Sequence, residues 1–229
     1  VSKSGMEISF IGTIDRVDTY VNNGKTYVRV VDYKSGEKSF RLEDILYGIN
    51  MQMLLYLFTI TQGDGKYSMS EPAGVLYMPS KELEPELSRN SSDEDLTNSK
   101  DKSFKMNGIL LDDEEVIRAM EKEVSGIYIP VKKAKDGYTK ASSLITKKQI
   151  GNLRKYAYNL LTEMADKLYN GQIDAIPLTN GKITPCDYCD YWSICGNDMQ
   201  KVRSYAPNSK DIIQEILNGD EEIAKQMDT

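Results

Sequence analysis

The sequence contains no histidine among its 229 residues, and this absence excludes several kinds of active site. Without histidine the chain cannot supply a Ser-His-Asp or Cys-His triad, an H-E-x-x-H zinc site or a two-cysteine, two-histidine zinc finger. Acid–base chemistry must therefore come from Asp, Glu, Lys, Tyr or Cys side chains. The chain also lacks any run of about 18 apolar residues, so we expect no membrane-spanning helix.

Cysteine is scarce as well: the chain has three, all within residues 186–195. This odd, clustered set does not suit a disulfide framework, and a reducing cytoplasm is the compartment that fits it. The first residues, Val1-Ser2-Lys3-Ser4, include no initiator Met and do not resemble a signal peptide. We therefore expect a cytoplasmic protein, and a chain that is a piece of something longer.

A net charge of −6 and a pI near 5.0 argue against a dedicated nucleic-acid module. The charge is uneven, however: residues 82–101 hold seven acids and two bases, and we expect a mobile acidic loop over residues 81–104. Residues 132–155 hold eight bases and one acid. Within this stretch Lys147 and Lys148 are candidates for contacting DNA phosphates; the alternative is a solvated helix start.

The periodicity of the apolar residues predicts an α/β core with a mixed sheet, opening with a hairpin. The expected strands cover residues 6–19, 25–34, 73–78 and 127–131. The expected helices cover residues 43–61, 112–124 with a capping box at Asp112 and Glu115, and a stretch from a second capping box at Thr146 and Gln149 to Gly171. The long helix carries Ile150, Leu153, Ala157, Leu160, Leu161, Met164 and Leu168 at core spacing, and the tail from Asp211 is expected to form one amphipathic helix.

The register of the opening hairpin follows from its turn. Asn23-Gly24 at the centre of a two-residue turn pairs residues whose numbers add to 47. Asp18 then faces Arg29, and this charge pair accounts for both side chains. We therefore assign Asp18 no further role.

In the same register Asp15 faces Asp32, and Lys34 projects from the same face two residues further on. Two opposed carboxylates repel each other unless a cation lies between them. Hard carboxylate oxygens suit Mg²⁺ or Mn²⁺, and a neighbouring lysine could serve an activated water. The alternative is a set of exposed strand charges with an Asp32–Lys34 salt bridge.

A second candidate pair lies on the expected helix over residues 43–61. Gln52 is the one polar amide in the apolar run 51–58, and Tyr56, four residues on, shares its face. A buried glutamine needs a hydrogen-bond partner. The alternative is a glutamine satisfied by local backbone beside a tyrosine of the core.

These elements resemble the PD-(D/E)XK nuclease core of the RecB type. The resemblance rests on Gly12-Thr13-Ile14-Asp15-Arg16-Val17-Asp18, on Val31-Asp32-Tyr33-Lys34-Ser35-Gly36, and on Gln52 with Tyr56. It implies a restriction-endonuclease-like fold whose mixed central sheet is flanked by helices. It also implies that Asp15, Asp32 and the main-chain carbonyl of Tyr33 bind the catalytic metal, that Lys34 is the catalytic lysine, and that Gln52 and Tyr56 lie near the DNA.

The cysteines extend the resemblance. Cys186, Cys189 and Cys195 form a C-x2-C-x5-C pattern similar to the iron–sulfur staple (residues 184–196) of AddB/RexB-type nuclease domains. A closed all-thiolate site needs four cysteines, and the chain has no fourth. We therefore expect no intact [4Fe–4S] cluster in this chain, although the full-length protein would hold one. A zinc site and three buried thiols are the alternatives.

Together these features resemble the C-terminal nuclease domain of an AddB/RexB-type helicase–nuclease subunit. The expected organisation is a nuclease domain over residues 1–200 and a helical tail over residues 201–229. The resemblance implies a bacterial, Mg²⁺- or Mn²⁺-dependent deoxyribonuclease that acts in double-strand break repair with an AddA/RexA-type partner; the separate chain could be weakly active or inactive. The alternatives are a CRISPR-associated iron–sulfur nuclease, against which the long insert at 81–140 argues, and an inactive nuclease fold that binds DNA or docks a subunit.

Overall fold

The computed structural model describes residues 4–5, 7, 9–36, 39–81, 92, 103–139, 141–179, 184–196 and 201–220. The chain forms two compact units. One, the sheet unit, comprises Ile11–Arg41 and Asn50–Arg154; the other, the tail unit, comprises Val1–Phe10, Leu42–Ile49 and Lys155–Thr229. The expected acidic loop at 81–104 lies almost wholly outside the described residues, and so do residues 221–229 of the tail.

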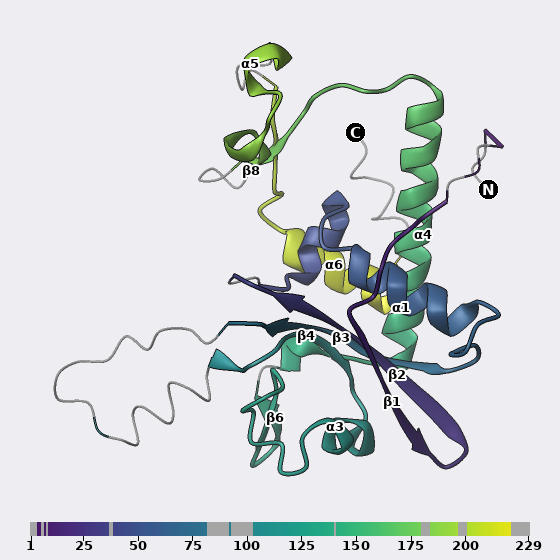
Figure 1. The fold of residues 1–229 in the computed structure, drawn as a ribbon, viewed down its shortest axis with the longest axis vertical. Helices are drawn as coiled ribbons and strands as arrows, with labels where there is room; N and C mark the ends of the chain where they lie inside the picture. Colours follow the sequence, from purple (N-terminus) through teal and green to yellow (C-terminus); the bar gives the residue numbers. More distant parts are fainter. Residues whose placement is uncertain are drawn as a thin grey trace. The chain divides into compact units, whose positions relative to one another are not determined.

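The sheet unit is built on a five-stranded mixed sheet in the order β1-β2-β3-β4-β7 (Figure 1). Its strands are β1 (Arg16–Asn22), β2 (Lys25–Lys34), β3 (Glu71–Pro79), β4 (Asn107–Leu111) and β7 (Leu144–Ile145). The β1–β2 and β3–β4 pairs are antiparallel, whereas β2–β3 and β4–β7 are parallel. The prediction of an α/β core with a mixed sheet is thereby confirmed.

The opening hairpin has the predicted register. Asn23 and Gly24 adopt positive φ angles of 49° and 74°, which suit a two-residue turn. The turn pairs Asn22 with Lys25 and, further along, Asp18 with Arg29. Pairing ends with Arg16 opposite Val31, so the strand expected over residues 6–19 begins ten residues late, and the expected cross-strand pair of Asp15 with Asp32 is not formed.

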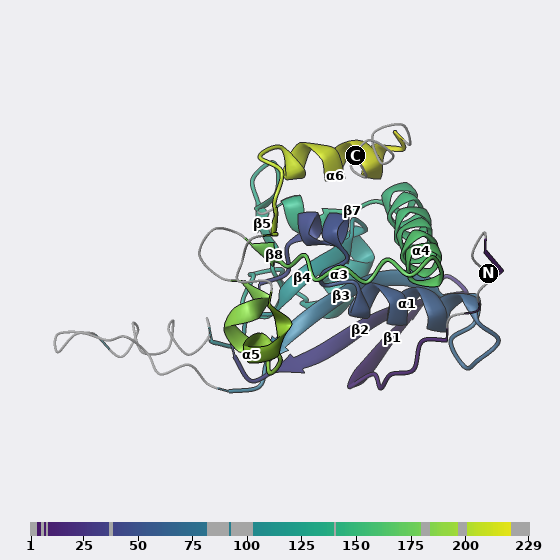
Figure 2. The same ribbon diagram turned by 90° about the horizontal axis from the view of Figure 1, so that it is seen from above.

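Helical and hairpin layers cover both faces of the sheet. Helix α1 (Gln52–Gln62) connects the parallel strands β2 and β3 and lies along both of them (Figures 1 and 2). Helix α3 (Glu114–Met120) and the hairpin of β5 (Lys132–Ala134) and β6 (Gly137–Thr139) lie on the other face. A 3-10 turn, η2 (Ala141–Ser143), precedes β7.

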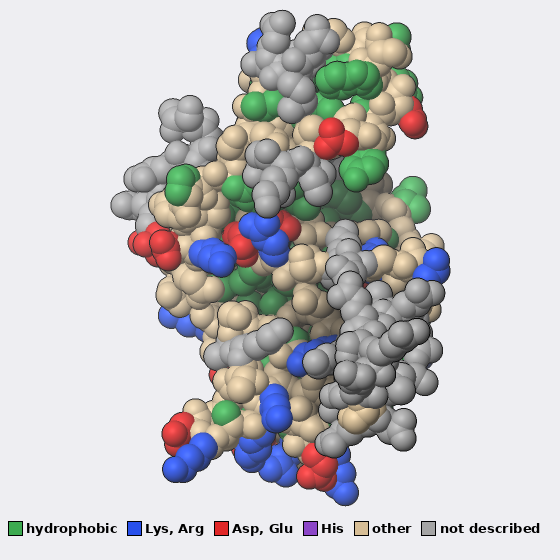
Figure 3. Space-filling model, turned by 90° about the vertical axis from the view of Figure 1, so that its left-hand side faces the viewer, with side chains coloured by type: hydrophobic (Ala, Val, Ile, Leu, Met, Phe, Trp, Pro, Cys, Tyr) green, Lys and Arg blue, Asp and Glu red, His purple; other side chains and the backbone are tan. Residues whose placement is uncertain are grey.

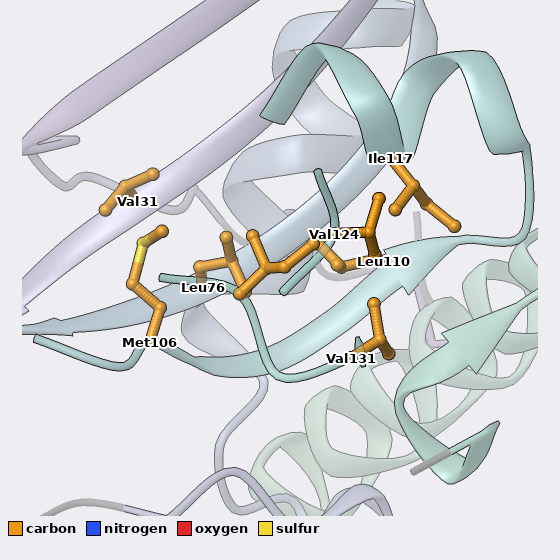
Figure 4. Close-up of a cluster of buried hydrophobic side chains, with 8 residues drawn as sticks. Val31, Leu76, Met106, Leu110, Ile117, Val124 and Val131 are labelled. Carbon is orange, nitrogen blue, oxygen red and sulfur yellow. The ribbon is translucent and has the colours of Figure 1, made fainter. Parts of the chain in front are cut away.

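Apolar side chains alternate between these two layers. Val31 and Leu76 are paired across β2 and β3 and pack with Ile117 of α3 in one buried cluster (Figure 4). Their neighbours Val30 and Val75, also paired and buried, point to the opposite face, where α1 lies. Arg29, in the middle of β2, is paired with Asp18, and Asp32 and Lys34 lie at the carboxyl end of the strand.

In the tail unit, the Tyr47 hydroxyl contacts the hydroxyl of Ser209 and accepts a hydrogen bond from the Ala206 amide. Its elements are η1 (Leu42–Tyr47), the part of α4 (Lys147–Tyr169) from Lys155 onward, β8 (Leu178–Thr179), η3 (Pro185–Tyr188), α5 (Trp192–Cys195), β9 (Arg203–Ser204) and α6 (Ser209–Asn218). Helix α6 is amphipathic, as expected, with four buried aliphatic side chains. Among the described residues no helix has both the length and the apolar character needed to cross a bilayer.

Several predicted boundaries are wrong. The single helix expected over residues 43–61 is two helices, because Gly48 and Asn50 adopt φ angles of 76° and 60° that interrupt the helical backbone. The N-cap of α3 is Asp113 instead of Asp112: its carboxylate accepts hydrogen bonds from the amides of Glu115 and Val116. The helix ends at Met120, short of the expected residue 124.

The sequence pattern also misplaced a strand. Residues 127–131 form no strand; their neighbourhood is a loop organised by the carboxylate of Glu121. The strand of this region is β4, which the pattern did not predict. In contrast, the capping box at Thr146 and Gln149 is confirmed by reciprocal hydrogen bonds.

Helix α4 has the predicted buried positions in its first half only. Ile150, Leu153 and Ala157 are buried, but Met164 and Leu168 are 37% and 54% exposed. Apolar spacing alone therefore overstated the buried length of this helix.

Candidate functional site

The predicted carboxylate–lysine set gathers at the carboxyl end of β2. Asp32 and Lys34 are on one face of the strand, and the Lys34 ammonium lies 2.5 Å from Asp32 Oδ2. Asp15 directly precedes β1, and its Oδ2 accepts a hydrogen bond of 2.9 Å from the amide of Tyr33. The structure therefore brings Asp15 to the residue between Asp32 and Lys34.

The Asp32 carboxylate lacks the hydrogen bonds that its burial would normally require. Its side chain is 14% exposed, and Oδ2 is buried without a hydrogen-bond donor among the described residues. The Lys34 ammonium supplies charge at this oxygen without an aligned hydrogen bond. An oxygen in this state is costly to bury and gains from a cation.

The predicted helix pair is present, but Gln52 is exposed instead of buried. Its amide donates a hydrogen bond of 2.9 Å to the Tyr56 hydroxyl, one turn along α1. The Tyr56 ring in turn lies against Gly12, where any Cβ atom would collide with it. The absence of a side chain at Gly12 thus lets Tyr56 approach the backbone three residues before Asp15. This contact holds α1 close to Asp15, the first of the candidate metal ligands.

Asp18 has the structural role expected of it. Its two carboxylate oxygens pair with Arg16 at 2.7 Å and with Arg29 at 2.8 Å. Burial raises the pKa of the Asp18 carboxyl, but the hydrogen bonds from the two arginines outweigh it and hold that pKa below its ordinary value. Hydrogen bonding to Asp18, with a smaller contribution from Tyr33, raises the pKa of Arg16.

One residue that the sequence analysis did not identify lies beside the set. Tyr77 of β3 pairs directly with Asp32, and its ring centroid is 5.4 Å from the Lys34 ammonium. In the sequence, Tyr77 is the one tyrosine in the apolar run over residues 73–78. Its position beside Lys34 could be predicted only once the parallel register of β2 and β3 was known.

The residues of the expected iron–sulfur staple do not form a closed site. Cys189 and Cys195 are exposed and Cys186 is partly exposed, and all three are free thiols. Thr184 caps the short helix η3 with reciprocal hydrogen bonds to residues 186 and 187. Among the described residues no three His, Cys, Asp or Glu side chains gather closely enough to hold a metal ion.

The two lysines proposed to contact DNA have different surroundings. Lys147 is 3.2 Å from Glu71 and lies over the ring of Tyr27, with 5.6 Å between its ammonium and the ring centroid. Lys148 is exposed and has no ion pair with any residue that the structure describes. Basic and acidic side chains are intermixed at the lower end of Figure 3, the level of α3 and β6 in Figure 1.

Comparison with known proteins gives a family match over most of the chain. The model of the PD-(D/E)XK nuclease superfamily matches residues 2–196. This range includes the hairpin, the α1 pair and the three cysteines. The match agrees with the mixed sheet flanked by helices and with the resemblance inferred from the motifs.

Curated relatives share one name, which describes each of them as the same subunit of an ATP-dependent helicase/deoxyribonuclease. The protein from Clostridium acetobutylicum is 39% identical over 198 residues, which are 85% of this chain and 17% of the relative. The protein from Clostridium kluyveri is 37% identical over 231 residues, 98% of this chain and 20% of the relative. The protein from Thermoanaerobacter sp. (strain X514) is 36% identical over 199 residues, 85% and 17% respectively. The chain thus spans about a fifth of the length of these relatives.

Proposed function

The chain belongs to the PD-(D/E)XK nuclease superfamily, and on this premise we propose that it is the DNA-cleaving domain of a helicase–nuclease. The relatives are named as subunits of an ATP-dependent helicase/deoxyribonuclease. For this chain we propose hydrolysis of phosphodiester bonds in DNA, together with an AddA/RexA-type helicase–nuclease subunit. Double-strand break processing and recombinational repair in a bacterial cytoplasm are the processes that this activity would serve.

The observation that carries the proposal is the buried Oδ2 of Asp32, which has the Lys34 ammonium at 2.5 Å but no hydrogen-bond donor among the described residues. A buried carboxylate oxygen without a donor is unfavourable, and a divalent cation at that oxygen would offset the cost. Asp15 reaches the same strand end through its bond to the Tyr33 amide and has further acceptor capacity. The donor set of two carboxylates and the main-chain carbonyl of Tyr33 consists of hard oxygens, which fit Mg²⁺ or Mn²⁺.

Each side chain then has a distinct role. A bound divalent ion would supply Lewis acidity and a water of lowered pKa. Lys34 would orient the attacking water or stabilise negative charge on the phosphoryl oxygens. Gln52 would use its exposed amide to contact the DNA backbone, with Tyr56 fixing the orientation of that amide through the 2.9 Å bond.

An iron–sulfur cluster does not fit the cysteines of this chain. Four thiolates are needed to close an all-cysteine site, and the chain supplies three, which are not gathered in the structure. We propose that a fourth thiolate lies in the part of the full-length protein outside this chain. No step of the proposed reaction depends on these cysteines.

Cleavage of linear DNA tests the proposed function. We expect the full-length protein, in complex with its helicase partner, to cleave DNA in the presence of Mg²⁺ or Mn²⁺, and Asp32→Ala to lower the rate about 1,000-fold. Asp18→Ala is the matched control, since it removes an acid from the same hairpin on the opposite face. Unchanged cleavage of both strands by Asp32→Ala would refute the assigned site.

A further inference from the structure

The ammonium group of Lys34 has two neighbours in the sheet unit. One is Asp32 Oδ2 at 2.5 Å, and the other is the ring of Tyr77, whose centroid is 5.4 Å away. A lysine ammonium within about 6 Å of a tyrosine ring centroid is attracted by the negative face of the ring. Lys34 is therefore held by a carboxylate and an aromatic ring together.

The location of Tyr77 follows from the strand register. Asp32 and Tyr77 are direct partners across the parallel β2–β3 pair, and Tyr77 is also paired with Asn107 of β4. Paired residues of neighbouring strands share a face of the sheet, and Lys34 shares that face with Asp32. The tyrosine is thus placed on the Lys34 side of the sheet by the backbone itself.

The ring of Tyr77 is also fixed by its surroundings. Tyr77 is only 5% exposed, and the ring of Phe40 packs against it with centroids 6.0 Å apart. The Phe40 amide donates a hydrogen bond of 2.5 Å to the side chain of Asn107, and the Tyr77 hydroxyl is 3.5 Å from Asn50 Oδ1. A ring held on several sides is a rigid support for a flexible lysine.

We propose that Tyr77 is a positioning residue for Lys34, and this inference rests on the proposed function. A divalent cation bound at Asp32 Oδ2 would compete with the Lys34 ammonium for this oxygen. When a metal ion is coordinated by Asp32, the Lys34 side chain loses its closest partner, and a four-carbon side chain without a partner samples many rotamers. The ring of Tyr77 keeps the ammonium at the site and so preserves the alignment that water attack requires.

The first test measures the position of Lys34 without DNA. In the 229-residue chain, ¹³C-dimethylated lysines are observed by NMR, and the Lys34 signal is identified by its absence in Lys34→Arg. We expect an upfield ring-current shift in wild type and Tyr77→Phe that is lost in Tyr77→Leu. The shift is expected to persist when Ca²⁺ is added. A wild-type Lys34 signal without this shift, or one that loses it on Ca²⁺ addition, would overturn the inference.

The second test measures cleavage by the full-length protein in its complex. Tyr77→Leu is expected to lower kcat about 10-fold with little change in KM, whereas Tyr77→Phe, which keeps the ring, stays within about 2-fold of wild type. Tyr138→Leu, a half-buried ring of β6, controls for loss of packing. Wild-type kcat in Tyr77→Leu beside an inactive Asp32→Ala would overturn the inference alone. Retained cleavage by Asp32→Ala would overturn the proposed function and the inference with it.

Discussion

Two carboxylates of the sheet unit are removed from solvent, and their hydrogen bonding is opposite. Glu121 is 8% exposed, and its two oxygens accept five hydrogen bonds, from the Ser125 hydroxyl and from the amides of residues 126–129. The Asp32 side chain is 14% exposed, and its buried Oδ2 has no hydrogen-bond donor among the described residues. Both acids are largely removed from solvent, but Glu121 is held by five hydrogen bonds, whereas Asp32 Oδ2 has the Lys34 ammonium as an ion-pair partner without an aligned hydrogen bond.

This difference is the one expected between a structural acid and a metal ligand of the proposed nuclease. The donors around Glu121 replace the water that its carboxylate loses, so the loop over residues 125–129 closes around it at little cost. Asp32 Oδ2 has only the charge of Lys34 nearby and no hydrogen-bond donor among the described residues, so its desolvation is compensated less completely. In the function proposed above, a divalent metal ion bound at the end of β2 would complete this compensation.

The largest expected effect comes from removing the satisfied acid. Glu121→Ala leaves several buried amides without an acceptor, and we expect the free energy of unfolding to fall by about 3 kcal/mol. Urea denaturation of the chain measures this. Glu123→Ala is the matched control, because Glu123 is exposed two residues away and should change stability by less than about 0.5 kcal/mol. Equal stability of the two variants would remove the structural role assigned to Glu121.

The unsatisfied acid is expected to respond to metal instead. Wild type should gain about 2.7 kcal/mol of stability at a Mg²⁺ or Mn²⁺ concentration 100 times the dissociation constant, because only the folded state holds the site. Asp32→Ala should lose this gain and change the metal-free stability by less than about 1 kcal/mol, since its ion pair with Lys34 is partly exposed. Thermal denaturation with and without metal distinguishes the two contributions. A metal-dependent gain that survives in Asp32→Ala would contradict the comparison.

The hydrogen bonding of Glu121 also predicts a pH dependence. Burial raises the pKa of its carboxyl, but the bonds from Ser125 and the loop amides outweigh burial and hold the pKa below the ordinary value of 4.5. Because the folded-state pKa is lowered, the stabilisation is complete above about pH 4.5 and is lost as the pH falls through the folded-state value. We expect stability between about pH 5 and pH 3 to fall less steeply in Glu121→Gln than in wild type. Glu123→Gln should keep the wild-type slope, and a wild-type slope in Glu121→Gln would contradict this.

The hairpin could be predicted from sequence because its determinants are local. Asn23-Gly24 alone specifies the turn, and the turn specifies every pair along β1 and β2, including Asp18 with Arg29. The candidate site follows from this register only in part, because pairing ends with Arg16 opposite Val31 and Asp15 meets β2 through the Tyr33 amide instead of facing Asp32.

What could not be predicted depends on contacts between distant segments. The environment of Glu121 exists only once residues 125–129 fold back on α3, and Tyr77 meets Lys34 only through the parallel pairing of β2 and β3. Gln52 was expected to be buried because its neighbours are apolar, yet it lies on the one exposed strip of α1. A run of apolar residues predicts that much of a helix is buried, but it does not predict whether a polar residue within the run is exposed to solvent.

The smallest expected effect concerns two neighbouring lysines that differ in the same way, one with an ion-pair partner among the described residues and one without. Lys147 is satisfied by Glu71 and by the ring of Tyr27, whereas Lys148 beside it has no ion pair with any described residue. An ammonium that keeps its partner within the protein neutralises fewer phosphates, so of these two lysines we expect Lys148 to contribute more to DNA binding. Lys148→Ala should therefore lower the salt dependence of DNA binding by about one unit of slope. Lys147→Ala should leave that slope unchanged and cost less than about 1 kcal/mol of stability.

Binding titrations over a range of salt concentrations test both variants. If Lys147→Ala lowers the slope and Lys148→Ala does not, pairing within the protein does not determine which of the two lysines binds a DNA phosphate.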